Sequence, residues 1–163
     1  MKLLIKVKKT NYRIDKFCSL NLLQNIYLRT MIKIEHIGIA VKDLEVSNEL
    51  FRKLLGKPAY KEESVESEAV KTSFFEIGES KIELLEAMNE NSAIAKYLNK
   101  NREGIHHIAF AVENLEKEIQ RLKNEGFEFI NEIPKKGADN KLVVFLHPKS
   151  TNGVLVELCS DEK

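Results

Sequence analysis

Two histidines and two glutamates occupy equivalent places in a duplicated sequence pattern. The stretches 34–45 and 105–116 align without a gap at a shift of 71 residues, with seven of twelve positions identical, so that His36 coincides with His107. The stretches 82–85 and 156–159 align at a shift of 74, which makes Glu83 the counterpart of Glu157. Two neutral imidazoles and two carboxylates balance the charge of a divalent cation. The repeat therefore predicts a six-coordinate Co, Mn, Ni or Zn site with two positions left for water or substrate.

The surroundings of the two glutamates differ. Glu157 lies between a valine and a leucine, where an ionised carboxylate is costly unless it is paired or bound to a metal. A nearby lysine could supply that pairing instead. Glu83 could lie on an exposed face of its strand, with Lys81 as its companion. The sequence therefore favours a functional role for Glu157 more strongly than for Glu83.

The remaining histidines and the cysteine of the last strand carry weaker signals. His106 precedes His107, and because neighbouring residues of a strand point to opposite faces, only one of the two should share a face with His36. His147 is expected to be structural, and Cys159 is expected to be an inert thiol at the end of an apolar strand. The sequence contains neither a short-range zinc motif nor a glycine-rich phosphate loop.

The elements that must position these residues also repeat. Each copy opens with a β-branched run that predicts a strand, and Asp43 or Asn114 then stands where a helix N-cap is expected. Helices are predicted over 44–55 and 115–125. The predicted strands that follow are 59–61, 70–77 and 81–86 in the first half, and 127–132, 141–147 and 153–159 in the second. Residues 92–101 are predicted to form a helical linker between the halves.

The pattern predicts an α+β fold made of two βαβββ modules, residues 31–90 and 103–160, within a single domain of residues 31–163. Each module has about sixty residues and is too small to bury a convincing core alone. The modules should therefore pair, edge to edge or face to face, and enclose a cleft that contains the metal site.

Charge and composition separate the first thirty residues from the rest. Residues 1–30 carry a net charge of +6 and residues 31–163 a net charge of −5. The first segment is therefore expected to be an extension outside the fold, with a targeting peptide as the alternative. The near-neutral total gives no reason to expect nucleic acid or membrane as a partner, and two cysteines in unrelated contexts favour the cytoplasm.

The sequence resembles the vicinal oxygen chelate family, which has the glyoxalase fold. The resemblance runs from about residue 31 to the end and rests on the paired histidine strands, on Phe-Leu-His-Pro-Lys-Ser at 145–150 and on Gly-Val-Leu-Val-Glu-Leu at 153–158. The last two motifs are more typical of the epimerases of that family. The resemblance implies that a divalent metal is held by the same four residues, His36, Glu83, His107 and Glu157.

The implied activity is that of an isomerase acting on methylmalonyl-CoA. Its α-proton would be removed and returned on the opposite face, through an enolate that chelates the cation. Glu157 is expected to be one acid–base group and Glu83 the other, while Lys149 and Ser150 in the long turn of the second half are expected to contact the substrate. The resemblance also favours a homodimer.

The sequence departs from the family pattern at one catalytic position. A second catalytic glutamate is expected on the middle strand of the first half, where this chain has Thr72. Three other functions compete with the epimerase. They are a glyoxalase I-type lyase acting on a glutathione hemithioacetal, a ring-cleaving dioxygenase, which would leave Glu83 unexplained, and a non-catalytic module that sequesters a ligand.

Overall fold

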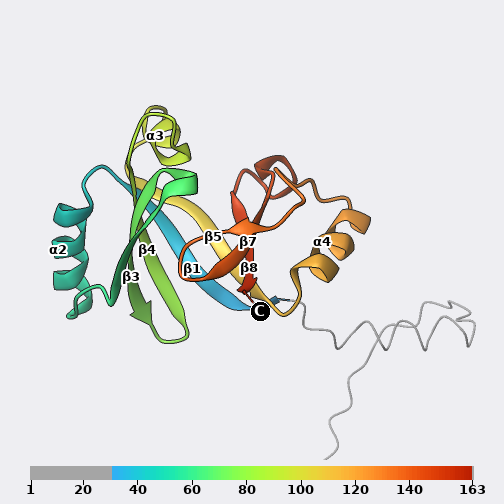
Figure 1. The fold of residues 1–163 in the computed structure, drawn as a ribbon, viewed down its shortest axis with the longest axis horizontal. Coiled ribbons are helices and arrows are strands. Elements are labelled where there is room, and N and C mark those ends of the chain that lie inside the picture. Colours follow the sequence, from blue (N-terminus) through green and yellow to red (C-terminus); the bar gives the residue numbers. More distant parts are fainter. Residues whose placement is uncertain (1–30, 163) are drawn as a thin grey trace, which may run out of the picture.

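The computed structural model describes residues 31–162 as one curled, mixed β-sheet flanked by helices (Figure 1). The predicted extension 1–30 lies outside the described residues. The elements are β1 (Met31–Val41), α2 (Leu44–Leu55), β2 (Lys61–Val65), η1 (Glu66–Glu68), β3 (Val70–Ile77), β4 (Ser80–Ala87), α3 (Ala93–Leu98), β5 (Gly104–Val112), α4 (Leu115–Asn124), β6 (Lys135–Lys136), β7 (Lys141–Leu146), η2 (Pro148–Ser150) and β8 (Val156–Asp161).

The two halves of the sequence join edge to edge. The strand order is β2-β3-β4-β1-β5-β8-β7-β6, so that the first strands of the two halves, β1 and β5, meet antiparallel in the middle of the sheet (Figure 1). On their other sides, β1 pairs parallel with β4, and β5 pairs parallel with β8. The same topology therefore occurs twice, and the last strand of each half lies beside its first.

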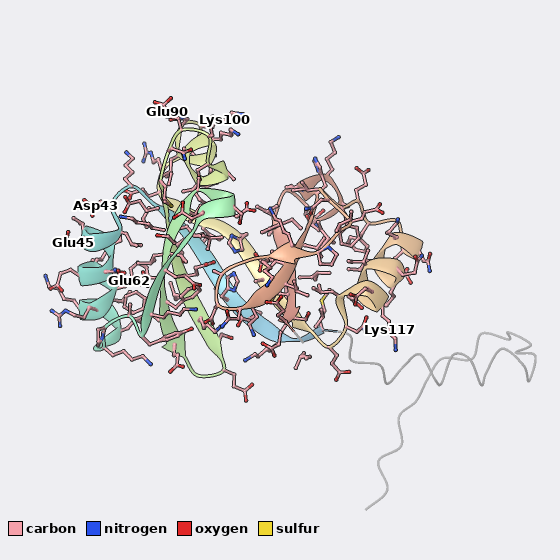
Figure 2. All side chains as sticks on the ribbon, in the orientation of Figure 1. Asp43, Glu45, Glu62, Glu90, Lys100 and Lys117 are labelled. Atoms are coloured by element: carbon pink, nitrogen blue, oxygen red, sulfur yellow. The ribbon has the colours of Figure 1, made fainter. Side chains whose placement is uncertain are left out.

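Local signals in the sequence explain the two long helices. The Asp43 carboxylate accepts a hydrogen bond of 2.9 Å from the Val46 amide, and the Asn114 side chain accepts one of 2.8 Å from the Lys117 amide, as expected of N-caps. Helix α2 ends at Gly56, whose φ of 72° is the left-handed conformation that favours glycine. Figure 2 shows Asp43 at the start of α2 and the Lys117 side chain pointing outward from α4.

The core is divided between the two halves. In the first half, Val41, Leu44, Phe75 and Leu84 form a buried cluster between α2 and the sheet. In the second half a larger cluster lies between α4 and the sheet, and it consists of Val112, Leu115, Ile119, Leu122, Val144, Leu146 and Leu158. Because both helices cover outward-facing sides of the curled sheet, the inner side remains for a site.

Three of the predicted strands are wrong in extent. The strand predicted at 59–61 is β2 at Lys61–Val65, a charged edge strand that apolar patterning does not reveal. The strand predicted at 127–132 is reduced to an isolated bridge between Phe129 and Leu146. Its phenylalanines pack on the second core cluster. Its backbone keeps two hydrogen bonds to the end of β7, from the Ile130 amide to the Phe145 carbonyl and from the His147 amide to the Glu128 carbonyl. The edge position that β2 holds in the first module is taken in the second by the two-residue strand β6. The last strand, predicted at 153–159, is β8 at Val156–Asp161.

Within residues 31–162, none of the helices combines the length and the apolar character needed to cross a membrane.

Candidate metal centre

The antiparallel pairing of β1 and β5 brings the two equivalent histidines together. His36 lies opposite Ala109, and His107 lies opposite Gly38. The Nε2 atoms of the two rings are 2.9 Å apart, and the rings meet edge to face with centroids 5.0 Å apart. Both side chains are buried. Two imidazoles that are 71 residues apart in the sequence therefore point their Nε2 atoms at one place.

Gly38 makes this approach possible. A Cβ atom built at position 38 would lie 2.5 Å from Nδ1 and 2.7 Å from Nε2 of His107, and closer still to Cε1. These separations are well below van der Waals contact, so the ring can lie over the β1 backbone only where there is no side chain. The equivalent position in the second half is Ala109, opposite His36. The two halves are therefore not interchangeable here, a feature that the sequence reasoning missed.

The two predicted glutamates reach the same place from the flanking strands. In the register, Glu83 of β4 lies beside Gly38, and Glu157 of β8 lies beside Ala109. Glu83 Oε2 is 3.2 Å from His36 Nε2 and 3.6 Å from His107 Nε2. The carboxylate oxygens of Glu157 are 3.5 Å from His107 Nε2 and 3.9 Å from His36 Nε2.

His36, His107 and Glu157 each offer one donor atom within 4.8 Å of the other two. Glu83 completes the ring of four buried side chains, and its second oxygen, Oε1, accepts a hydrogen bond of 2.9 Å from the Thr72 hydroxyl. Thr72, where a further glutamate was expected, therefore orients the Glu83 carboxylate.

The protonation equilibria of these groups are strongly displaced. Burial alone would lower the pKa of His36, but hydrogen bonds to Glu35 and Glu83 raise it to about 10. Burial raises the pKa of Glu157 to about 8 and lowers that of His107 to about 3. Burial alone would raise the pKa of Glu83, whereas the hydrogen bond and charge of His36 hold it below its usual value. The His36 imidazolium thus supplies a positive charge that a cation could replace.

The donor set fits a divalent cation. Two donors at right angles around an ion, each about 2.1 Å from it, are about 3.0 Å apart, and donors on opposite sides are about 4.2 Å apart. The separations between the imidazole nitrogens and their partners run from 2.9 to 3.9 Å, so the shortest is close to the right-angle value and the others lie between the two values. The four side chains are buried and offer both nitrogen and oxygen donors. They carry two negative charges once His36 and Glu157 have lost their protons, so the residues present suit Co, Mn, Ni or Zn.

Each ligand histidine is contacted on its Nδ1 side by the residue that precedes it in the sequence, Glu35 for His36 and His106 for His107. Glu35 Oε2 is 2.6 Å from His36 Nδ1, and His106 Nδ1 is 3.0 Å from His107 Nδ1. The expectation that His106 and His107 face opposite sides of the sheet is wrong, because both line the same cavity. Sequence reasoning missed Glu35, although it stands at the repeat position equivalent to His106.

The four donors lie in a cavity of about 250 Å³ between the two halves. Its wall is largely apolar, with Val70, Leu85, Ile94, Val143, Phe145 and Leu155 among its side chains. At its edge, Lys135 of the second half is paired with Glu68 of the first at 2.6 Å and lies 5.9 Å from the centre of the Phe145 ring. Asp139 forms a second bridge between the halves, with Lys61 at 3.0 Å and Lys81 at 2.7 Å.

The two predicted substrate-binding residues lie in η2, outside the lining of this cavity. The Ser150 hydroxyl donates a hydrogen bond of 3.0 Å to the His147 carbonyl, and it accepts one of 3.2 Å from the Glu128 amide. The Lys149 amide donates to His147 Nδ1 at 3.1 Å. These contacts account for the turn, and substrate binding by Lys149 and Ser150 stays a prediction.

The sequence matches the Glyoxalase/Bleomycin resistance protein/Dioxygenase superfamily over residues 35–145. Among its relatives, an ethylmalonyl-CoA/methylmalonyl-CoA epimerase of Cereibacter sphaeroides is 41% identical over 128 residues, which are 77% of this chain and 96% of that protein.

Two similar solved structures hold acyl-CoA compounds. One is a Streptomyces coelicolor methylmalonyl-CoA epimerase variant in complex with 2-nitronate-propionyl-CoA. The other is a methylmalonyl-CoA epimerase in complex with methylmalonyl-CoA and NH4+. Each is 34% identical to this chain with a TM-score of 0.77, and each alignment covers 80% of this chain and 95% of the other. The glyoxalase-like fold expected from the sequence is thus confirmed.

Proposed function

This chain belongs to the Glyoxalase/Bleomycin resistance protein/Dioxygenase superfamily, and on that premise we propose that it is an isomerase that epimerises methylmalonyl-CoA. The observation that carries the proposal is the convergence of four buried side chains, His36, His107, Glu83 and Glu157, in one cavity of a chain whose relatives are methylmalonyl-CoA epimerases. A proton next to a thioester and a carboxylate must leave one face of the α-carbon and return on the other.

The four side chains of the centre would hold a divalent ion, Co, Mn, Ni or Zn. An ion at that position supplies Lewis-acid chemistry, which lowers the cost of negative charge on the thioester oxygen. His36 and His107 contribute neutral nitrogen donors, and the carboxylates offset the charge of the ion. The hydrogen bond from Thr72 restricts the rotation of the Glu83 carboxylate and leaves Oε2 directed at the imidazoles.

Glu157 takes up the proton on one face of the α-carbon. Burial raises the pKa of its carboxyl to about 8 without a metal, and a bound ion would lower it again, so that the carboxylate is ionised and ready to accept a proton. A group of this kind contributes roughly 10² to 10⁴ in rate. Glu83, across the imidazole pair from Glu157, is assigned the delivery of a proton to the opposite face, a proton that it must first take from solvent because its lowered pKa leaves it ionised. Its lower pKa makes it the weaker base of the two.

The cavity suits the acyl end of the substrate rather than the whole molecule. Its volume of about 250 Å³ lies below the roughly 300–1,000 Å³ of pockets that enclose drug-sized ligands. The acyl group would occupy it, and the apolar wall would exclude water from the reacting carbon. The nucleotide tail then lies outside, where Lys149 and Ser150 remain the residues assigned to it.

The proposal includes a cytoplasmic homodimer. Within residues 31–162 the sheet ends at β2 on one side and at the two-residue strand β6 on the other, and exposed edges of this kind are common places for pairing between chains. A cytoplasmic location is supported by Cys159, a buried free thiol, as is usual in a reducing compartment.

Exchange of the α-proton tests the activity directly. Methylmalonyl-CoA is incubated with the protein in D2O, with each of the four metals and with a chelator, and the α-position is followed by proton NMR. We expect rapid deuterium incorporation that the chelator abolishes and that Glu157→Gln lowers by about 10² or more. Glu76→Gln, an exposed carboxylate of β3, is the matched control and should exchange normally.

A parallel assay with methylglyoxal and glutathione distinguishes the epimerase from a glyoxalase I-type lyase. Turnover of the hemithioacetal, together with no exchange at the α-position of methylmalonyl-CoA, would overturn the proposal.

A further inference from the structure

We propose that Glu35 and His106 are positioning residues that direct the Nε2 atoms of His36 and His107 into the metal centre. The inference rests on the proposed metal site and concerns two side chains that are not among its four donors. It begins from the repeat, in which Glu35 and His106 are equivalent at the same shift of 71 residues that relates the two ligand histidines.

Irregular strand pairing turns both residues toward the cavity. In a regular strand, Glu35 and His36 would point to opposite faces, as would His106 and His107. The register between β1 and β5 shifts between Ile34 and His36, and it shifts again opposite the segment from Ile105 to His107. Each shift is a bulge that re-aims a side chain. As a result, both preceding residues line the cavity alongside the donors.

Both side chains contact the ring nitrogen that faces away from the centre. Glu35 Oε2 lies 2.6 Å from His36 Nδ1, and His106 Nδ1 lies 3.0 Å from His107 Nδ1. An imidazole that offers the Nε2 lone pair to a metal carries its proton on Nδ1 and needs an acceptor there. A carboxylate is such an acceptor, and so is the unprotonated nitrogen of a neutral imidazole.

With Nε2 of His107 directed to the metal, the contact between the two Nδ1 atoms assigns the tautomers of both rings. His107 carries its proton on Nδ1, and His106 accepts that proton's hydrogen bond and carries its own proton on Nε2. The His106 ring is held from its other side by Tyr97 of α3, whose ring meets it edge to face at 5.0 Å. Its orientation is thus set by packing as well as by the hydrogen bond.

Glu35 is anchored in a similar way by cations from both halves. Lys81 Nζ of β4 is 2.5 Å from Glu35 Oε1, and Lys141 Nζ of β7 is 3.8 Å from the same oxygen. The other carboxylate oxygen remains for His36. The partner of one ligand histidine is thus an anchored carboxylate, and the partner of the other is a packed imidazole.

Metal affinity tests the proposal without relying on turnover. Glu35→Gln and His106→Phe are compared with the wild type by titration of the metal-free protein with Co²⁺ against a competing chelator. We expect the dissociation constant to rise about 10- to 100-fold in each variant. Glu35→Asp should restore part of the loss, because a carboxylate remains. Glu118→Gln removes an equally buried carboxylate outside the cavity and should bind Co²⁺ normally.

Nitrogen-15 NMR of the imidazoles tests the positioning of His107 in the metal-free protein. We expect the Nδ1–H tautomer at His107 in the wild type and its redistribution toward Nε2–H in His106→Phe. If that variant folds poorly, His106→Gln replaces it and should retain the tautomer, because the amide oxygen accepts a hydrogen bond.

The results separate this inference from the proposed function. Unchanged Co²⁺ affinity in Glu35→Gln and His106→Phe would overturn the inference and leave the epimerase intact. An Nε2–H tautomer at His107 in the wild type would overturn the part played by His106. Failure of the wild type to bind any metal would overturn the proposed function, and the tautomer measurement would still decide whether His106 orients His107.

Discussion

Replacing Gly38 by alanine tests whether the close approach of the two strands positions the metal centre. The added Cβ would lie 2.5 Å from His107 Nδ1, whereas ordinary contact needs about 3.5 Å, so the ring must move by about 1 Å. The His36–His107 separation of 2.9 Å cannot survive such a shift unchanged. A misplacement of about 1 Å in a catalytic group can cost about 10²-fold in rate, or about 2.7 kcal/mol.

We therefore expect Gly38→Ala to lower kcat/KM for α-proton exchange by about 100-fold and to weaken Co²⁺ binding. Crowding of this kind also costs about 1–3 kcal/mol of unfolding free energy, which urea denaturation measures. The matched control is Gly56→Ala at the end of α2, where the left-handed φ of 72° makes alanine unfavourable but nothing lies within 4 Å of the new Cβ.

Gly56→Ala should lose about 1 kcal/mol of stability and keep full activity and metal affinity. The reasoning is refuted if Gly38→Ala retains activity and Co²⁺ affinity within threefold of the wild type. The reasoning is also refuted if Gly56→Ala, at the same unfolding free energy, loses as much activity and Co²⁺ affinity as Gly38→Ala. The defect would then come from general destabilisation.

Three further predictions concern the surroundings of the donors. Asp139→Ala should lower the unfolding free energy by about 1–3 kcal/mol in urea denaturation, because Lys81 loses a half-buried partner at 2.7 Å; an unchanged midpoint would contradict this. Thr72→Val should weaken Co²⁺ binding about tenfold in a chelator competition, because the Glu83 carboxylate loses the hydrogen bond that orients it. Equal affinity would show that this hydrogen bond is dispensable. Metal binding should release the proton of His36, whose pKa is about 10, and below pH 8 also the proton of Glu157, whose pKa is about 8. The apparent metal affinity should therefore rise with pH by about 100-fold per unit below pH 8 and by about tenfold per unit from pH 8 to 10. Calorimetry in buffers of different ionisation enthalpy counts the released protons, and a pH-independent affinity would refute the assignment.

The sequence by itself determined the features that are local or duplicated. The N-caps at Asp43 and Asn114 depend on residues three positions away, so the starts of α2 and α4 were predicted correctly. The repeat named His36, His107, Glu83 and Glu157 together, because equivalent positions on two similar modules point into a shared space, and the structure places all four there. The two-module α+β architecture followed from the same repetition.

Only the tertiary structure decided the features that depend on pairing between distant strands. Whether the halves met edge to edge or face to face was open, and the β1–β5 register resolves it. The bulges that turn Glu35 and His106 inward interrupt the alternation that sequence reasoning must assume, and the need for glycine at position 38 arises from a ring 69 residues away in the sequence. The physical reason is that periodicity describes one strand at a time, whereas register, bulges and close approaches are set jointly by two.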